Sequence, residues 1–146
     1  PVGVISKSGG MTAEISRILS EQGIGQTTAV GIGGDPLIGS DFLDIALLFE
    51  RDLETRALVI FGEVGGVYEE RLAGALASGT LTKPVVALIA GVFAETLPGE
   101  TPLGHAGAII EGGRGAASAK ISMLEAAGAL IARTPEDIPV LLKTVL

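Results

Sequence analysis

The chain alternates short apolar segments with segments of helical periodicity, and most of the apolar segments end at glycines. The apolar segments are apolar on both faces, which is typical of parallel strands covered by helices on each side of the sheet. Five strands are expected, at Val2–Ser6, Thr27–Ile32, Ala57–Phe61, Pro84–Ala90 and Ala129–Ala132. A repeated strand–helix order predicts an α/β chain built on one parallel sheet.

The intervening segments predict helices, and one of them shows its inward face clearly. Ser40 or Asp41 can cap a helix that runs to about Glu50, with its apolar stripe on Phe42, Ile45, Leu48 and Phe49. The other helices are expected at about Thr12–Gln22, Tyr68–Ala77 and Ala117–Ala127, and from Thr134-Pro135 onward. The predicted fold is a flavodoxin-like, doubly wound, five-stranded parallel sheet with helices on both faces. All 146 residues are expected to form this single domain.

Composition excludes several functional classes. The chain has no cysteine and one histidine, so a disulfide scaffold, a cysteine nucleophile and a multi-histidine metal site are excluded, and no metal site is predicted. Its net charge is −7 and its basic residues are scattered, which argues against a nucleic-acid surface. No uncharged apolar run reaches the roughly 18 residues of a membrane span, and no leader opens the chain. A cytoplasmic protein without a membrane or nucleic-acid partner is expected.

Candidate chemistry gathers at one edge of the predicted sheet. In folds of this class, ligands bind beyond the carboxyl ends of the strands. Three strand ends carry paired glycines, at Gly9-Gly10, Gly33-Gly34 and Gly65-Gly66, and the long connection 91–115 leaves the same edge. That connection contains His105, so the fold places this histidine on the same rim as Ser8, Asp35 and Glu63. Connections of this length in a compact domain are usually functional or disordered.

The first glycine turn is a candidate phosphate site. Ser8, Gly9 and Gly10 lie between a strand and a helix start, where backbone N–H groups and the helix dipole favour an anion. A plain strand–helix turn with a serine cap explains the same residues equally well.

His105 and Glu63 are the candidate catalytic residues. His105 stands among small residues, and a neutral imidazole is a competent nucleophile whose natural partner at a helix terminus is a phosphoryl group. Glu63 can accept the other ring N–H, which fixes the tautomer and raises the nucleophilicity of the ring. The alternatives are a structural or surface histidine and a solvated glutamate.

Other polar groups near the rim suggest ordinary structure. Asp35-Pro36 is expected to form a turn. Arg114 is expected to be solvated within a flexible Gly112–Gly115 loop, and Glu69-Glu70-Arg71 to form an exposed first helical turn.

These segments resemble one known family in order and in spacing. The matching stretches are Ser8-Gly9, Gly31-Ile32-Gly33-Gly34-Asp35-Pro36, Gly62-Glu63-Val64-Gly65-Gly66, Lys83-Pro84-Val85-Val86, Ile89-Ala90-Gly91 and Gly104-His105-Ala106-Gly107-Ala108-Ile109-Ile110. Together they resemble the C-terminal, ligase-CoA domain of the succinyl-CoA synthetase alpha subunit, within the nucleoside-diphosphate-forming acyl-CoA synthetases.

The resemblance implies a phosphoryl relay within a tricarboxylic acid cycle ligase. A nucleoside triphosphate, a carboxylic acid and coenzyme A give acyl-CoA, nucleoside diphosphate and phosphate. His105 corresponds to the histidine that is phosphorylated transiently. Glu63 corresponds to the glutamate that orients it, and Ser8 and Gly9 correspond to the helix start that holds the phosphoryl group. Gly10 stands where the family often has threonine, which removes one hydroxyl contact to phosphate.

The resemblance also implies partners outside this chain. The nucleotide site is expected on an ATP-grasp beta subunit, and the CoA-binding Rossmann domain of the alpha subunit is expected to lie outside this chain. No covalently bound cofactor is expected; coenzyme A and ATP or GTP with Mg²⁺ are substrates bound mainly elsewhere. The chain is therefore not expected to turn over alone. The segment 92–103 looks longer than is usual in the family, so the acid remains open among succinate, malate, citrate and acetate.

Two other functional classes remain as alternatives. The segment Ser6–Thr12 resembles a flavin phosphate loop, which would suit an FMN electron carrier, but the chain has only five aromatic residues and no tryptophan to stack on a flavin. A non-catalytic interaction domain, with His105 incidental, is the second. A response-regulator domain needs clustered acids after the first strand, where this chain has serine and glycine.

Overall fold

The computed structural model describes residues 1–97, 104–108 and 115–146. Its centre is one parallel sheet in the order β2-β1-β3-β4-β5. The strands are β1 (Val2–Ser6), β2 (Gln26–Gly31), β3 (Ala57–Glu63), β4 (Val85–Ala90) and β5 (Leu130–Ala132). This is the flavodoxin-like order, in which the chain reverses its direction of travel across the sheet between β1 and β3. The predicted fold class is confirmed.

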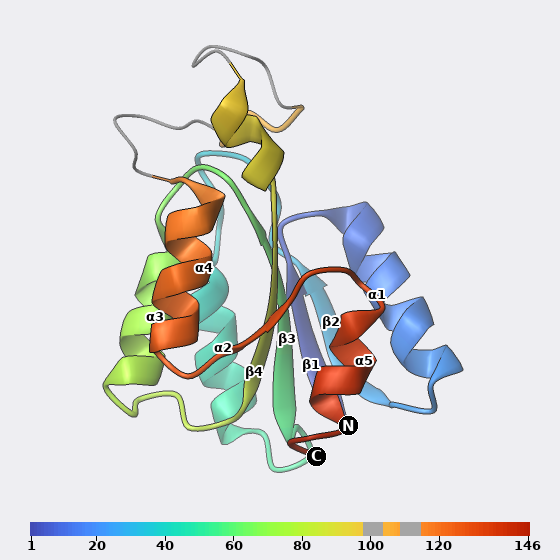
Figure 1. Ribbon diagram of the computed structural model, residues 1–146. Helices are drawn as coiled ribbons and strands as arrows, with labels where there is room; N and C mark the ends of the chain where they lie inside the picture. The colour runs from blue at the N-terminus through green and yellow to red at the C-terminus, as the bar shows by residue number, and fades with distance from the viewer. Residues whose placement is uncertain (98–103, 109–114) are drawn as a thin grey trace.

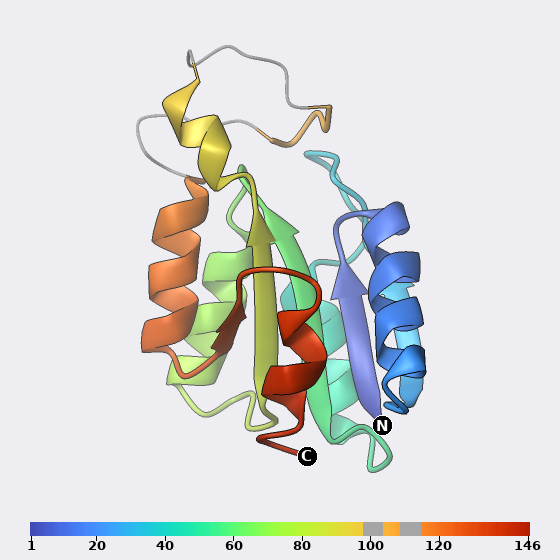
Figure 2. The same cartoon turned by 45° about the vertical axis from the view of Figure 1, so that its right-hand side comes forward.

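Helices cover both faces of this sheet (Figures 1 and 2). Two lie on one face, α1 (Gly9–Glu21) and α5 (Asp137–Leu142), and three on the other, α2 (Phe42–Arg51), α3 (Tyr68–Ala77) and α4 (Ala117–Ala126). A short 3-10 helix, η1 (Val92–Thr96), follows β4 at the carboxyl edge of the sheet. Both termini lie at the opposite edge (Figure 1).

The sheet separates two aliphatic cores. Alternate residues of β1 and β3 point to opposite faces, so Ile5 and Ile60 pack toward α2, α3 and α4, while Val4 and Val59 pack toward α1 and α5. All four side chains are fully buried. Packing on both faces thus fixes the central strands, and it thereby fixes the positions of the residues at their carboxyl ends.

Two helices begin at residues other than those predicted. α1 begins at Gly9 instead of Thr12, because the Ser8 hydroxyl oxygen accepts the N–H of Met11 and caps the helix directly after the strand. α5 begins at Asp137, three residues after Thr134, because the Asp137 carboxylate accepts the N–H groups of Arg133 and Thr134 and closes a turn there.

The predicted inward face of α2 was partly wrong. Asp41 caps the helix as expected, through the N–H groups of Leu43 and Asp44. The buried stripe, however, is Phe42, Ala46 and Phe49, and Leu48 is 62% exposed. The stripe follows the i, i+4, i+7 rows that meet the sheet, and Leu48 lies outside it.

No helix in residues 1–97, 104–108 and 115–146 combines the length and the apolar character that crossing a bilayer requires.

Gly3 in β1 is expected to tolerate no side chain. A Cβ there would lie 2.8 Å from three atoms of the Phe49 ring, which α2 presses onto the sheet. Gly3→Ala is therefore expected to lower the free energy of unfolding by about 1–3 kcal/mol through overpacking. Gly74→Ala on the exposed face of α3, where nothing lies within 4 Å of the new Cβ, should raise it by about 0.5–1 kcal/mol. Urea unfolding of both variants measures this difference, and equal midpoints would show that Phe49 yields.

Candidate active site

The structure brings His105 and Glu63 into contact. The Nδ1 atom of His105 lies 2.8 Å from each carboxylate oxygen of Glu63. An ionised carboxylate only accepts hydrogen bonds, so Nδ1 carries the proton in this arrangement. In a neutral imidazole with that proton on Nδ1, the other ring nitrogen, Nε2, carries the lone pair. The His105 side chain is 40% exposed and that of Glu63 is 13% exposed, so the pair is accessible from solvent on the histidine side.

Glu63 is held by the sheet itself. The structure extends β3 two residues beyond the predicted end, so Glu63 is its last residue and pairs with Ala90 of β4. A carboxylate on a central strand is positioned more rigidly than one on a loop. In the predicted contact, Glu63 is therefore held by the sheet, and His105 is held by segment 104–108.

Gly34 forms the floor beneath the histidine ring. A Cβ at this position would lie 2.3 Å from His105 Nδ1 and 2.8 Å from Glu63 Oε1. The Gly34 carbonyl also accepts the N–H of Gly107 at 3.0 Å, which ties the histidine segment to the turn after β2. Gly107 is equally constrained, since its own Cβ would lie 2.8 Å from that carbonyl oxygen. The glycines of the two motifs are thus needed for close approach of the two backbones.

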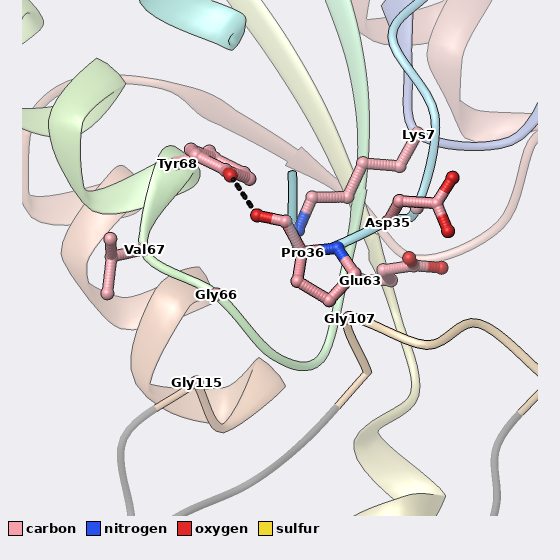
Figure 3. Close-up of a pocket in the computed structure, with 10 residues that line it drawn as sticks. Lys7, Asp35, Pro36, Glu63, Gly66, Val67, Tyr68, Gly107 and Gly115 are labelled. Atoms are coloured by element: carbon pink, nitrogen blue, oxygen red, sulfur yellow. Dashed lines mark hydrogen bonds between the residues drawn. The ribbon is translucent and has the colours of Figure 1, made fainter. Parts of the chain in front are cut away.

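A cavity of about 390 Å³ is lined in part by Glu63 of this pair (Figure 3). Its walls come from the ends of β1 and β3, the turn after β2 and the start of α3. Tyr68 closes one side by donating its hydroxyl hydrogen to the Pro36 carbonyl at 3.0 Å. The lining residues are Lys7, Gly34, Asp35, Pro36, Glu63, Gly66, Val67, Tyr68, Gly107 and Gly115. The cavity lies at the carboxyl ends of β1 and β3, where doubly wound sheets bind ligands.

The predicted phosphate turn lies at the same edge, but its contacts are local. Ser8 is the N-cap of α1, and Gly9 and Gly10 form the first turn. Within the described part of the chain, the hydrogen bonds of Ser8 are all to residues 6–12. The structure therefore contains the serine cap that a plain strand–helix turn would have. The Ser8 hydroxyl hydrogen is not used by that cap, because the oxygen is the acceptor. Phosphate binding at Ser8, Gly9 and Gly10 stays a prediction.

Hydrogen bonds hold both described ends of the 91–115 connection. Glu95 in η1 accepts the backbone N–H and the hydroxyl of Ser118, at 2.7 and 2.8 Å, near the start of α4. These hydrogen bonds lower the pKa of the Glu95 carboxyl. Gly115 accepts the N–H of Gly65 at 2.7 Å. Arg114, with residues 112 and 113, lies outside the described residues.

One prediction about this region was wrong. Glu69 is fully buried instead of belonging to an exposed helical turn. Its carboxylate forms ion pairs with two buried lysines, Lys7 at 2.9 Å and Lys120 at 2.5 Å. These partners lie 62 and 51 residues away in the chain, so nothing in the local sequence around Glu69 indicated them. Asp35 lines the cavity through the expected turn.

Comparisons with known proteins show which family this chain resembles. The CoA-ligase family profile matches residues 5–130. The alpha 2 subunit of an ADP-forming succinate–CoA ligase from Archaeoglobus fulgidus is 48% identical over 145 residues, which are 99% of this chain and 49% of that protein. The corresponding alpha subunit from Staphylococcus aureus is 50% identical over 137 residues, 94% of this chain and 44% of that protein.

Other relatives act on different acids. An ADP-forming sulfoacetate-CoA ligase subunit, SqwL, from Acholeplasma sp is 44% identical over 142 residues, 97% of this chain and 47% of that protein. Among solved structures, ATP citrate lyase from Methanosaeta concilii in complex with (3S)-citryl-CoA superposes with a TM-score of 0.89 at 37% identity. It covers 99% of this chain, which corresponds to 23% of the lyase chain.

The chain spans about half the length of the curated relatives it matches. None of these relatives favours an FMN carrier or a non-catalytic interaction domain. The family profile, the sequence relatives and the superposed structure agree over nearly the whole chain, and they show that it belongs to the CoA-ligase family, with close similarity to the alpha subunits of ADP-forming succinate–CoA ligases.

Proposed function

We propose that this chain is the phosphohistidine-carrying, C-terminal domain of an alpha subunit in a nucleoside-diphosphate-forming acyl-CoA ligase of the succinate–CoA ligase type. His105 relays a phosphoryl group between a nucleotide and an acyl phosphate. The observation that carries the proposal is the contact between Nδ1 of His105 and the Glu63 carboxylate, which leaves Nε2 as the nucleophile.

The proposed relay has two phosphoryl-transfer steps, which are followed by acyl transfer to coenzyme A. In the direction of acyl-CoA formation, Nε2 attacks the γ-phosphorus of the nucleoside triphosphate and the nucleoside diphosphate leaves. The ring is then an N-phosphorylated imidazolium whose Nδ1–H faces the Glu63 carboxylate, which stabilises the positive charge. A carboxylate oxygen of the acid attacks the phosphorus next, so the N–P bond breaks and an acyl phosphate forms. The coenzyme A thiolate finally displaces phosphate from the acyl carbon.

The start of α1 is the proposed cradle for the phosphoryl group. Ser8 keeps a hydroxyl hydrogen to donate, and Gly9 and Gly10 present backbone at the positive end of a 13-residue helix without an acidic residue in its first turn. Coenzyme A, the nucleotide with Mg²⁺ and the acid would be held mainly by other parts of the enzyme. Those parts are an ATP-grasp beta subunit and a CoA-binding domain, within a cytoplasmic enzyme.

The experiment that tests the proposal is phosphorylation in the assembled enzyme. The chain is combined with the beta subunit and the CoA-binding domain and incubated with γ-labelled ATP or GTP and Mg²⁺. The proposal predicts one label on the chain that is lost in acid and kept in base, as expected for a phosphorus–nitrogen bond. Addition of the acid and coenzyme A should discharge it. A label that resists acid, or none on the chain, would contradict the relay.

Glu63→Gln is expected to slow this phosphorylation about 10- to 100-fold, a range typical for a residue that orients a reacting histidine. The amide keeps the size of the side chain but loses the charge that faces the imidazolium. Single-turnover labelling rates measure the effect. Glu54→Gln, at an exposed position beyond the end of α2, is the matched control and should label at the unaltered rate. Equal rates in both variants would remove Glu63 from the mechanism.

A further inference from the structure

Lys120 is a buried lysine with three well-placed acceptors. It projects from α4, and 1% of its surface is exposed. Its Nζ atom donates to the carbonyl oxygen of Glu63 at 2.9 Å, to that of Gly65 at 2.5 Å and to the Glu69 carboxylate at 2.5 Å. An ammonium group has three N–H donors, so this arrangement uses all of them.

Glu69 completes the hold on the same stretch of backbone. Its Oε1 atom accepts the N–H of Glu63 at 3.2 Å, while its Oε2 atom pairs with Lys120. Both polar backbone groups of Glu63 therefore end on buried charged side chains. Lys7 pairs with Glu69 Oε1 at 2.9 Å and donates to the Gly65 carbonyl at 3.2 Å, but it makes no hydrogen bond to Glu63. Hydrogen bonds to charged groups are about twice as strong as neutral ones.

Burying the charged side chains of Lys7, Glu69 and Lys120 costs desolvation free energy, so stability of the loop alone does not explain this cluster. Burial lowers the pKa of Lys120, and the neighbouring Glu69 carboxylate opposes that shift. Apolar replacements of a buried ion network are often neutral or stabilising. What apolar side chains cannot do is fix the direction of two carbonyl groups and one N–H at the end of a strand.

We propose that Lys120, together with Glu69, is a positioning residue for the Glu63–His105 pair. The hydrogen bonds from Lys120 and Glu69, here called the clamp, fix the backbone of Glu63. They thereby direct its carboxylate at Nδ1 of His105 and hold the ring with Nε2 unprotonated. Its consequence for phosphoryl transfer rests on the proposed function, whereas its effect on the ring does not.

The tautomer of His105 gives a direct readout of this role. The chain has one histidine, so ¹⁵N-histidine labelling yields a single pair of ring signals. At alkaline pH, where the imidazole is neutral, the hydrogen bond to Glu63 should favour the Nδ1–H form by about tenfold or more. Lys120→Met, which keeps an unbranched side chain without donors, is expected to lower this ratio about tenfold.

Lys83→Met is the matched control. Lys83 also donates from Nζ to two backbone carbonyls, those of Phe49 and Asp52, at the opposite edge of the sheet. The Lys83→Met substitution removes lysine hydrogen bonds of the same kind and should leave the His105 tautomer ratio unchanged. Should Lys120→Met fail to fold, Glu69→Gln carries the test, since it keeps the side-chain size and is expected to move the ratio in the same direction.

In the assembled enzyme, Lys120→Met should also slow labelling of His105 about tenfold. The positioning role is overturned if a folded Lys120→Met or Glu69→Gln chain keeps the unaltered tautomer ratio, or if Lys83→Met lowers it equally. A changed ratio in a chain that is never phosphorylated would sustain the positioning role and contradict the relay. An unchanged ratio in a chain that is phosphorylated normally would do the reverse.

Discussion

Replacing His105 with alanine is expected to abolish phosphorylation of the chain, with a loss on the order of 10³-fold or more in labelling rate. The chain has no second histidine and no cysteine, so no other side chain of comparable nucleophilicity at neutral pH can take over. The His105 ring is 40% exposed, so its removal should leave the unfolding midpoint nearly unchanged. Labelling of His105→Ala at the unaltered rate would show that the phosphoryl group is carried elsewhere.

Gly34→Ala is expected to reduce phosphorylation about 10²-fold, because a shift of about 1 Å in a reacting group can cost that much. The new methyl group would occupy the space of His105 Nδ1 and Glu63 Oε1, so the pair cannot keep its contact. Gly34 does not have a positive φ, so alanine adds no backbone strain there. The effect therefore reports on the side-chain pair and not on the turn.

Gly39→Ala supplies the control for this substitution. It lies in the same connection between β2 and α2, does not have a positive φ, and has nothing within 4 Å of its new Cβ. Rapid-quench labelling of both variants, with unfolding midpoints measured in parallel, separates the contact from general stability. Similar labelling rates in Gly34→Ala and Gly39→Ala would mean that the ring has room to move aside.

The sheet and the rim of the site could be predicted because their signals are local. Each apolar run followed by a helical pattern identifies one strand, and parallel strands bring their carboxyl ends to one edge. That reasoning placed Glu63 and His105 together, although 42 residues separate them. Boundaries were less predictable. α1 begins at Gly9 because one serine oxygen caps it, and a pair of glycines in sequence does not indicate a helix start.

The support beneath the pair could not be predicted, because it depends on contacts between distant elements. Glu69 in the first turn of α3 has the pattern of an acid that faces solvent near a helix dipole. Only the packing of α4 against α3 brings Lys120 to it. The close approach at Gly34 was equally hidden, since a glycine pair after a strand indicates a turn and not which side chain crosses it.

In the proposed relay, Nε2 of His105 carries the phosphoryl group while Glu63 holds Nδ1. The most direct measurement is ³¹P and ¹⁵N NMR of the phosphorylated chain, prepared in the assembled enzyme and denatured in base, where phosphohistidine survives. We expect phosphorus bonded to Nε2 of the single histidine. Phosphorus on Nδ1, or an acid-stable phosphate ester on a serine such as Ser8, would contradict it.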